Sequence, residues 1–206
     1  MHTNMKKTKT SPPPKRPYNQ TARAEAAEAT AARIVDVFYG FLTSDWYDSI
    51  SLDSVAKAAG VTVPTILRRF GSKEGLLEAA KEKMEREVEA RRAVKPGDVV
   101  AAVDSIVNDY EAAADIMLRI MAQEDRLAVL KELTDYGRMQ HRDWVEASFA
   151  PQLAGLKPAE REWRLDGLVT ALDIYVWKVL RIDRARSPPE VARYMRNLVK
   201  GILDGQ

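Results

Sequence analysis

Cysteine is absent from the 206-residue sequence, and histidine occurs only twice, as His2 and His141. The missing thiols exclude disulfide bridges and thiolate metal sites. Two histidines far apart in the sequence offer little material for a metal site or an acid–base cluster, so we expect no metal and no cofactor. A glycine-rich phosphate loop and a nucleophile with a histidine partner are also missing. The sequence therefore predicts that the chain is not an enzyme.

Long apolar runs and strand-like alternation are missing as well. No stretch approaches the ~20 apolar residues that are needed to cross a bilayer. The basic N-terminus is not followed by the apolar segment of a signal peptide, so we expect a cytoplasmic protein. No run of strict two-residue alternation is long enough for a sheet. Hydrophobic residues make up 46% and charged residues 30% of the chain. This composition is typical of a soluble globular protein, and the chain is expected to be all-α.

The net charge of +2 conceals an uneven distribution along the chain. Residues 1–95 contain 17 Lys and Arg against 12 Asp and Glu, whereas residues 96–206 contain 15 against 18. The front half is thus the better partner for a polyanion, although such an excess is also common on solvated helices. Residues 1–19 are basic and proline-containing, with too little apolar surface to fold. We expect a disordered basic arm there, which either contacts DNA or serves as a solubilising tail.

Apolar side chains at three- and four-residue spacing predict a series of helices separated by glycine, proline and small polar residues. The clearest interruption is Lys95–Gly97, where proline and glycine are adjacent. We expect residues 20–77 to form a DNA-binding domain and residues 78–206 a second helical domain. The predicted helices cover about residues 21–43, 51–59, 62–70, 72–92, 98–108, 111–123, 126–149, 158–181 and 188–203.

The most informative segment runs from Ser51 to Phe70 and predicts two short helices joined by a tight turn. Ser51 is a favoured N-cap residue for the first helix, and Gly60 suits a left-handed stop at its end. Thr62 can cap the second helix, where Pro64 falls in the first turn and its missing N–H costs little. A helix-turn-helix of this kind places its second helix in the DNA major groove.

The segment from Leu52 to Leu77 resembles the TetR family of bacterial transcriptional regulators. The resemblance rests on Ala-Lys-Ala-Ala-Gly-Val-Thr (56–62), Pro-Thr-Ile (64–66), Arg-Arg-Phe (68–70) and Gly-Ser-Lys-Glu-Gly-Leu-Leu (71–77), and it extends more loosely to Arg33-Ile34 and Phe41-Leu42. It implies a three-helix DNA-binding head, a linking helix, and a C-terminal helical domain for ligand binding and dimerisation. It also implies a repressor that a small molecule releases from a palindromic operator in double-stranded DNA.

The resemblance and the helical pattern together give candidate DNA-contacting residues. Thr62 and Lys73 each stand at a helix start, where the resemblance implies phosphate contacts. Side chains on the outer face of the second helix are expected to meet base edges, with Arg68 or Arg69 reading guanine. The full set is Thr62, Val63, Pro64, Thr65, Arg68, Arg69 and Lys73.

Two positions depart from the family pattern. Trp46 stands before Tyr47 in the loop after the first helix, where the family usually has glycine, so this loop is expected to pack differently. Leu67 occupies a position that is usually a phosphate-contacting tyrosine, and leucine cannot donate that hydrogen bond. Both departures bear on which operator is read more than on DNA binding itself.

In the back half, the resemblance implies a homodimer and a small-molecule pocket. Amphipathic stripes on the last two helices are candidates for the dimer interface, or they pack into their own subunit: Leu168, Leu172, Tyr175, Val176, Val191, Met195, Leu198 and Ile202. Methionine and aromatic side chains of the body are candidates for the pocket, although such residues are more often core: Met117, Met121, Tyr136, Met139, Trp144 and Trp177.

Other classes of function remain open at this stage. A helical adaptor would use the same head to bind a protein rather than DNA. Salt distinguishes the two, because binding to DNA phosphates weakens steeply as salt is added. A role at a membrane surface is less favoured, because the basic residues do not lie opposite a continuous apolar face.

Overall fold

The computed structural model describes residues 20–205, and within this range every regular element is helical, as the sequence predicted. The predicted basic arm, residues 1–19, lies outside the described residues. The elements are α1 (Gln20–Ser44), η1 (Tyr47–Ser49), α2 (Leu52–Ala59), α3 (Val63–Phe70), α4 (Lys73–Arg91), α5 (Val99–Met121), α6 (Ala128–Ser148), α7 (Ala150–Leu153), α8 (Pro158–Ala171), α9 (Ile174–Lys178), η2 (Val179–Asp183) and α10 (Pro188–Leu203).

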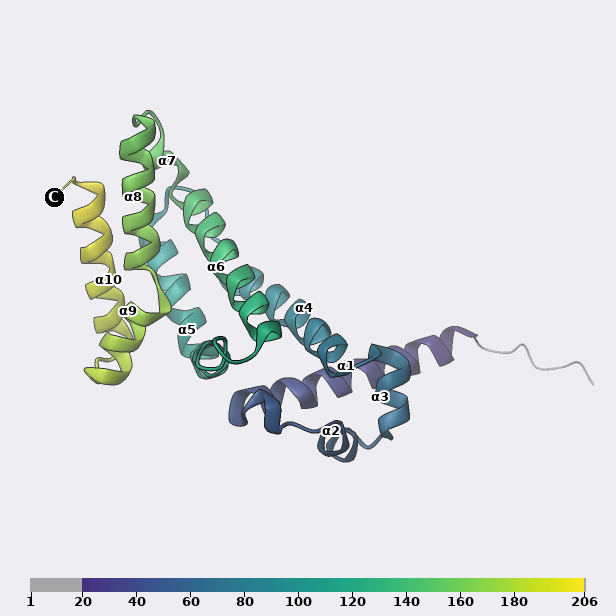
Figure 1. Cartoon of the computed structure of the whole chain (residues 1–206). Helices are drawn as coiled ribbons and strands as arrows, with labels where there is room; N and C mark the ends of the chain where they lie inside the picture. Colours follow the sequence, from purple (N-terminus) through teal and green to yellow (C-terminus); the bar gives the residue numbers. More distant parts are fainter. Residues whose placement is uncertain (1–19, 206) are drawn as a thin grey trace, which may run out of the picture.

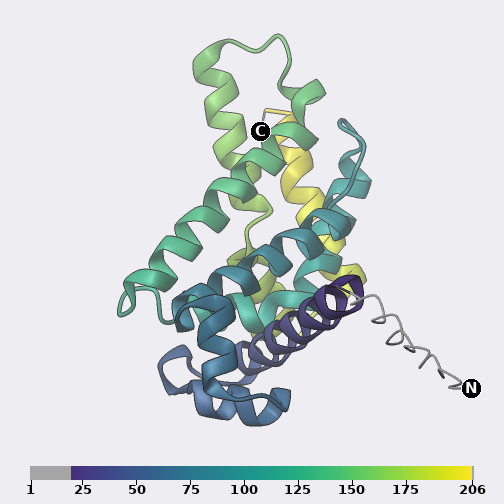
Figure 2. The same ribbon diagram turned by 90° about the vertical axis from the view of Figure 1, so that its right-hand side faces the viewer.

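Helices α1, α2 and α3 lie together at one end of the molecule, and α8 and α10 lie away from them (Figure 1; Figure 2). We call α1–α3 with the first turns of α4 the head, and the rest the body. The predicted boundary between residues 77 and 78 falls inside α4, which runs without interruption from the head toward the body (Figure 1). The predicted boundary between the two domains therefore does not coincide with a break in secondary structure.

The local signals of the head begin and end its helices where the sequence placed them. Ser51 Oγ accepts a hydrogen bond from the Ser54 N–H at 3.1 Å at the start of α2. Gly60 ends α2 in the left-handed region, at φ 65°, and Gly71 ends α3 at φ 77°. Side chains other than glycine rarely adopt these angles, so the two glycines determine the turns on either side of α3.

The start of α3 differs from the expectation in one detail. Thr62 occupies the N-cap position, but its side chain does not bond the backbone of the first turn. Its hydroxyl instead lies 3.0 Å from the hydroxyl of Thr65. Pro64 lies in the first turn as predicted, where no intrahelical N–H is needed.

Two apolar cores stabilise the fold. The head core contains buried residues of α1, η1, α2, α3 and α4, including Phe38 and Ile66, both without solvent exposure. It also includes Ile116, Ile120 and Leu130 from α5 and the start of α6. The body core is formed by α5 to α10. Because α5 contributes buried side chains to both cores, this helix links the interior of the head to that of the body.

Two predicted helix boundaries in the body are wrong. The expected helices over 98–108 and 111–123 form the single helix α5 (Val99–Met121). The expected helix over 158–181 instead ends at Ala171, and α9 begins after Asp173. Tyr110 bears on both errors. It is buried within α5, and its hydroxyl donates to the Leu172 carbonyl oxygen at 2.9 Å, where α8 ends.

Candidate nucleic-acid interface

The outer face of α3 is the surface that the sequence assigned to DNA. Ile66 points into the head core without solvent exposure, so the opposite side of the helix faces outward. Pro64, Leu67 and Arg68 are exposed on that side, with 41% of the Leu67 surface accessible. Val63 and Thr65 are half-buried on its flanks. The face is thus apolar at its centre and carries one cationic side chain.

The two arginines of α3 differ in their surroundings. Arg69 lies nearer the buried side of the helix, and its Nη2 is 2.6 and 2.7 Å from the carboxylate oxygens of Glu28 on α1. Arg68 makes no hydrogen bond or ion pair with any residue in the range 20–205. Within residues 20–205 the Arg68 guanidinium group is thus unpaired, whereas Arg69 would have to share or leave Glu28 to read a base.

Lys73 stands at the first position of α4 and bridges toward the loop that follows α1. Its Nζ donates a hydrogen bond to the Tyr47 carbonyl oxygen and lies 4.2 Å from the centroid of the Tyr47 ring. Burial lowers the pKa of Lys73, while the carboxylates of Asp48 and Glu74 oppose that shift. An ammonium group has three N–H donors, so one contact to a carbonyl leaves two for a phosphate.

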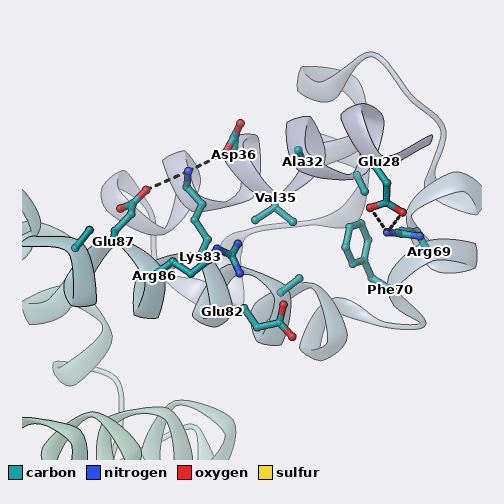
Figure 3. A pocket seen from close by; sticks show the side chains of 13 residues that line it. Glu28, Ala32, Val35, Asp36, Arg69, Phe70, Glu82, Lys83, Arg86 and Glu87 are labelled. Carbon is teal, nitrogen blue, oxygen red and sulfur yellow. Dashed lines mark hydrogen bonds and ion pairs between the residues drawn. The ribbon is translucent and has the colours of Figure 1, made fainter. Parts of the chain in front are cut away.

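A groove lined by both charged and apolar side chains lies between α1 and α4 and ends at Arg69 (Figure 3). Lys83 on α4 spans it, with Nζ 3.0 Å from Asp36 and 3.1 Å from Glu87 (Figure 3). The Arg69–Glu28 pair closes its other end. These ion pairs join α1 to α3 and α4. None of the residues predicted for the ligand pocket lines this groove.

Residues 47–80 match the sequence profile described as "Bacterial regulatory proteins, tetR family". This segment is therefore similar to the DNA-binding domain of the TetR family. The matched segment contains η1, α2, α3 and the first turns of α4, and it includes every residue predicted to contact DNA. The match supports a DNA-binding transcription regulator, as the sequence predicted.

Solved structures share the fold over most of this chain at low sequence identity. A transcriptional regulator from Rhodococcus sp. Rha1 is 18% identical, with a TM-score of 0.66 over 85% of this chain and 96% of that one. A tetR-family transcriptional regulator from Streptomyces coelicolor is 18% identical, with a TM-score of 0.64 over 85% of this chain and 79% of that one. A TerR/AcrR-family transcriptional regulator from Aquifex aeolicus VF5 is 15% identical, with a TM-score of 0.62 over 84% of this chain and 99% of that one. A search of curated proteins by sequence found no significant match.

Residues 20–205 contain no group of three or more His, Asp or Glu side chains placed to hold a metal ion. None of the helices described is both long enough and apolar enough to cross a membrane.

The six residues predicted for the ligand pocket lie in different surroundings. Trp177 is buried beside Tyr110, and its indole N–H donates to Glu111 at 3.0 Å. Met139 is half exposed on α6. The remaining four, Met117, Met121, Tyr136 and Trp144, are half-buried on α5 and α6. The assignment of all six to one pocket stays a prediction.

Tyr136 contacts α4, and Trp144 contacts the residue that follows it. The Nζ atom of Lys81 lies 4.2 Å from the centroid of the Tyr136 ring. The Trp144 indole N–H donates to the Arg92 carbonyl oxygen, just after the end of α4, at 2.9 Å. These two side chains place the face of α6 that carries the predicted pocket against the helix that leads to the head.

The body contains a buried charged cluster that the sequence analysis did not predict. Asp109 has no solvent exposure, and its two oxygens accept hydrogen bonds from Arg91 Nε and Arg92 Nε, both at 2.6 Å. Arg92 is 7% exposed, and its Nη1 lies 3.4 Å from His141 Nδ1. One signal could have revealed it, because Asp109 falls on the same helix face as Ile106 and Ala113.

The predicted dimer residues divide into two groups. Leu168, Leu172, Val191 and Met195 have no solvent exposure and belong to the core of their own chain, so they have no surface for a partner. Tyr175 and Leu198 are about half exposed. Together with five neighbours they line a shallow, largely apolar hollow on α9, η2 and α10, which we call the α9–α10 patch: Tyr175, Val176, Val179, Leu180, Tyr194, Asn197 and Leu198. Ile202 is half-buried and contacts Gly167 of α8.

Proposed function

We propose that this chain is a homodimeric repressor that binds a palindromic operator through α3 and is released by a small molecule bound in the body. The exposed face of α3, where Arg68 has no ion-pair partner among residues 20–205, carries the proposal. A bidentate contact from arginine to guanine O6 and N7 discriminates against other bases by ~1–3 kcal/mol. Arg68 is available for this contact without breaking an ion pair within residues 20–205, and Pro64 and Leu67 beside it present apolar surface to thymine methyl groups.

The dimer is supported by the α9–α10 patch. Val179 and Tyr175 are each 50% exposed, Leu198 is 47% and Tyr194 is 40%. Large apolar side chains gathered in one surface hollow are typical of an interaction site. A two-fold dimer uses the same patch on both copies, and it would carry two heads to two operator half-sites.

The ligand site is supported by the position of α6 against α4. Met117, Met121, Tyr136 and Trp144 are half-buried, and the last two contact α4 and the residue just after it. A ligand that separates α6 from α4 would change the placement of the head and thereby the affinity for DNA. Lowered operator affinity in the presence of a compound that also raises the melting temperature would support this part of the proposal.

The first experiment is selection of bound sequences from a random double-stranded DNA pool. Wild type, Arg68→Ala, Arg69→Ala and the double variant are run in parallel at moderate salt. We expect wild type to enrich a palindrome, Arg68→Ala to lose enrichment at one position of each half-site, and Arg69→Ala to retain most of it. Binding should weaken steeply with salt. Failure of wild type to enrich any sequence, or a salt-insensitive complex with a protein, would favour a helical adaptor instead.

A further inference from the structure

A chain of hydrogen bonds connects the turn between α5 and α6 to the loop after α1. The Tyr47 backbone N–H donates to Gln123 Oε1 at 2.8 Å. Gln123 Nε2 donates to the Arg119 carbonyl oxygen at 2.8 Å. The Arg119 Nε in turn donates to the Thr43 carbonyl oxygen, at the end of α1, at 3.0 Å. The body thus holds the backbone of the head at Thr43 and at Tyr47.

Gln123 can make these bonds in only one orientation. Its side chain is 1% exposed, so water does not compensate a lost partner. The amide oxygen must face the Tyr47 N–H, and the amide nitrogen must face the Arg119 carbonyl. Rotating the amide by half a turn would set donor against donor and acceptor against acceptor. The amide therefore fixes the loop position relative to α5.

The other side of Tyr47 holds Lys73. The Tyr47 carbonyl oxygen accepts a hydrogen bond from Lys73 Nζ, and the Tyr47 ring lies 4.2 Å below that nitrogen. The ring is itself buried and packs edge-on against Phe38, with centroids 6.5 Å apart. Burial raises the pKa of Tyr47 to about 12, so the phenol stays neutral beneath the ammonium group. Tyr47 is thus a rigid intermediary between a buried amide of the body and a cation of the head.

We propose that Gln123 is a positioning residue for DNA binding, which acts through Tyr47 to aim the Lys73 ammonium group at a DNA phosphate. This inference rests on the proposed function, because it takes Lys73 as a phosphate contact. Arg126 contacts the same loop from outside, 3.6 Å from Asp48 and 5.8 Å from the centroid of the Trp46 ring. Those groups are exposed, so their contribution is small, and the buried Gln123 amide determines the geometry.

The test uses the full chain and four variants. Gln123→Met keeps the length of the side chain and removes both hydrogen bonds, whereas Gln123→Glu keeps the acceptor for the Tyr47 N–H. Lys73→Met and the double variant Gln123→Met with Lys73→Met complete a double-mutant cycle. Gln152→Met is the matched control, because the Gln152 amide donates to the Gly97 carbonyl at 2.9 Å in the body, away from the head.

Two readouts are measured for each variant. Hydrogen exchange of the Tyr47 amide reports the bond to Gln123 without any DNA. Affinity for a duplex of random sequence, measured over a range of salt, reports the phosphate contact, because such contacts do not depend on sequence. A variant that has lost one phosphate contact per head should show a salt slope smaller by about one for each head.

We expect Gln123→Met to lose protection at the Tyr47 amide and to bind the duplex roughly tenfold more weakly, with a smaller salt slope. Gln123→Glu should restore only part of the affinity, because it keeps the acceptor for the Tyr47 N–H but sets an oxygen against the Arg119 carbonyl. Gln123→Met should cost nothing further in the Lys73→Met background. Gln152→Met should behave as wild type.

Three results would overturn the proposal. Unchanged protection of the Tyr47 amide in Gln123→Met would show that the bond does not hold the loop. Additive losses in the double variant would show that Gln123 acts on stability and not through Lys73. Absence of duplex binding by wild type would remove the proposed function and the positioning role together, whereas additive losses on a wild type that binds would leave the proposed function intact.

Discussion

The backbone of Gly75 lies against the carbonyl oxygen of Phe70, so closely that a Cβ atom at position 75 would overlap it. This contact sets how nearly the start of α4 approaches the end of α3. Gly75→Ala should therefore force the two helices apart and lower the free energy of unfolding by ~1–3 kcal/mol, as for other overpacked sites. Urea denaturation measures the change, and DNA affinity should fall with it because α3 is displaced.

Gly137 on α6 provides the control for that substitution. A Cβ atom at position 137 would meet nothing within 4 Å. Gly137→Ala should raise the free energy of unfolding by ~0.5–1 kcal/mol through better helix propensity. Equal effects at the two positions would show that the contact with Phe70 is not decisive.

Removing the charge of Asp109 should destabilise the body strongly. Asp109→Asn leaves the Arg91 and Arg92 guanidinium groups beside a neutral amide, and Arg92 is 7% exposed. Breaking a buried charge pair typically costs ~3–5 kcal/mol, which thermal and urea unfolding would both detect. Asp104→Asn on the same helix is the control, since its pair with Arg196 is accessible to solvent and should be worth ~1 kcal/mol or less. A loss as small as that of the control would contradict the prediction.

His141 should make stability depend on pH between about pH 4 and neutrality. Burial, followed by the nearby Arg92 charge, lowers the pKa of His141 to about 4. In the unfolded chain a histidine titrates near 6.5. Between these values the unfolded state binds a proton that the native state refuses, so stability is lost as pH falls, by at most ~1.4 kcal/mol per pH unit. The free energy of unfolding should therefore be measured at pH 7.5 and pH 5 for wild type and for His141→Gln. The decrease from pH 7.5 to pH 5 should be smaller in the variant than in wild type.

A charge placed in the α9–α10 patch should separate the proposed dimer. Leu198→Glu puts a carboxylate in the apolar hollow, where dimerisation would bury it without a partner. Sedimentation equilibrium should give the monomer mass for this variant and the dimer mass for wild type. Val100→Glu is matched in exposure and lies on α5 outside the patch, so it should remain dimeric. A dimeric Leu198→Glu would place the interface elsewhere.

The head could be predicted closely from the sequence because its signals are local. Ser51 caps α2, and Gly60 and Gly71 supply the backbone angles that end α2 and α3. Each of these residues acts within a few positions of itself, so a pattern along the chain identifies it. The outer face of α3 follows from the position of Ile66, because the side of the helix opposite this buried residue must face outward.

The body could be predicted less well because its boundaries and polar contacts depend on residues distant in the sequence. Tyr110 bonds a carbonyl 62 positions away, where α8 ends without any glycine or proline. The spacing of Leu168 and Met195 identifies an apolar stripe but not whether it faces the chain's own core or a partner. Gln123 and Lys73 likewise meet through Tyr47 only in three dimensions.

Because Ile116, Ile120 and Leu130 complete the core beneath the head, the head is not an interchangeable module. A chimera that joins residues 20–77 to the body of a distant relative would pair this core with apolar side chains of another shape. Grafting a new operator preference onto this chain should therefore succeed by exchanging the outward residues of α3 and fail by exchanging whole heads.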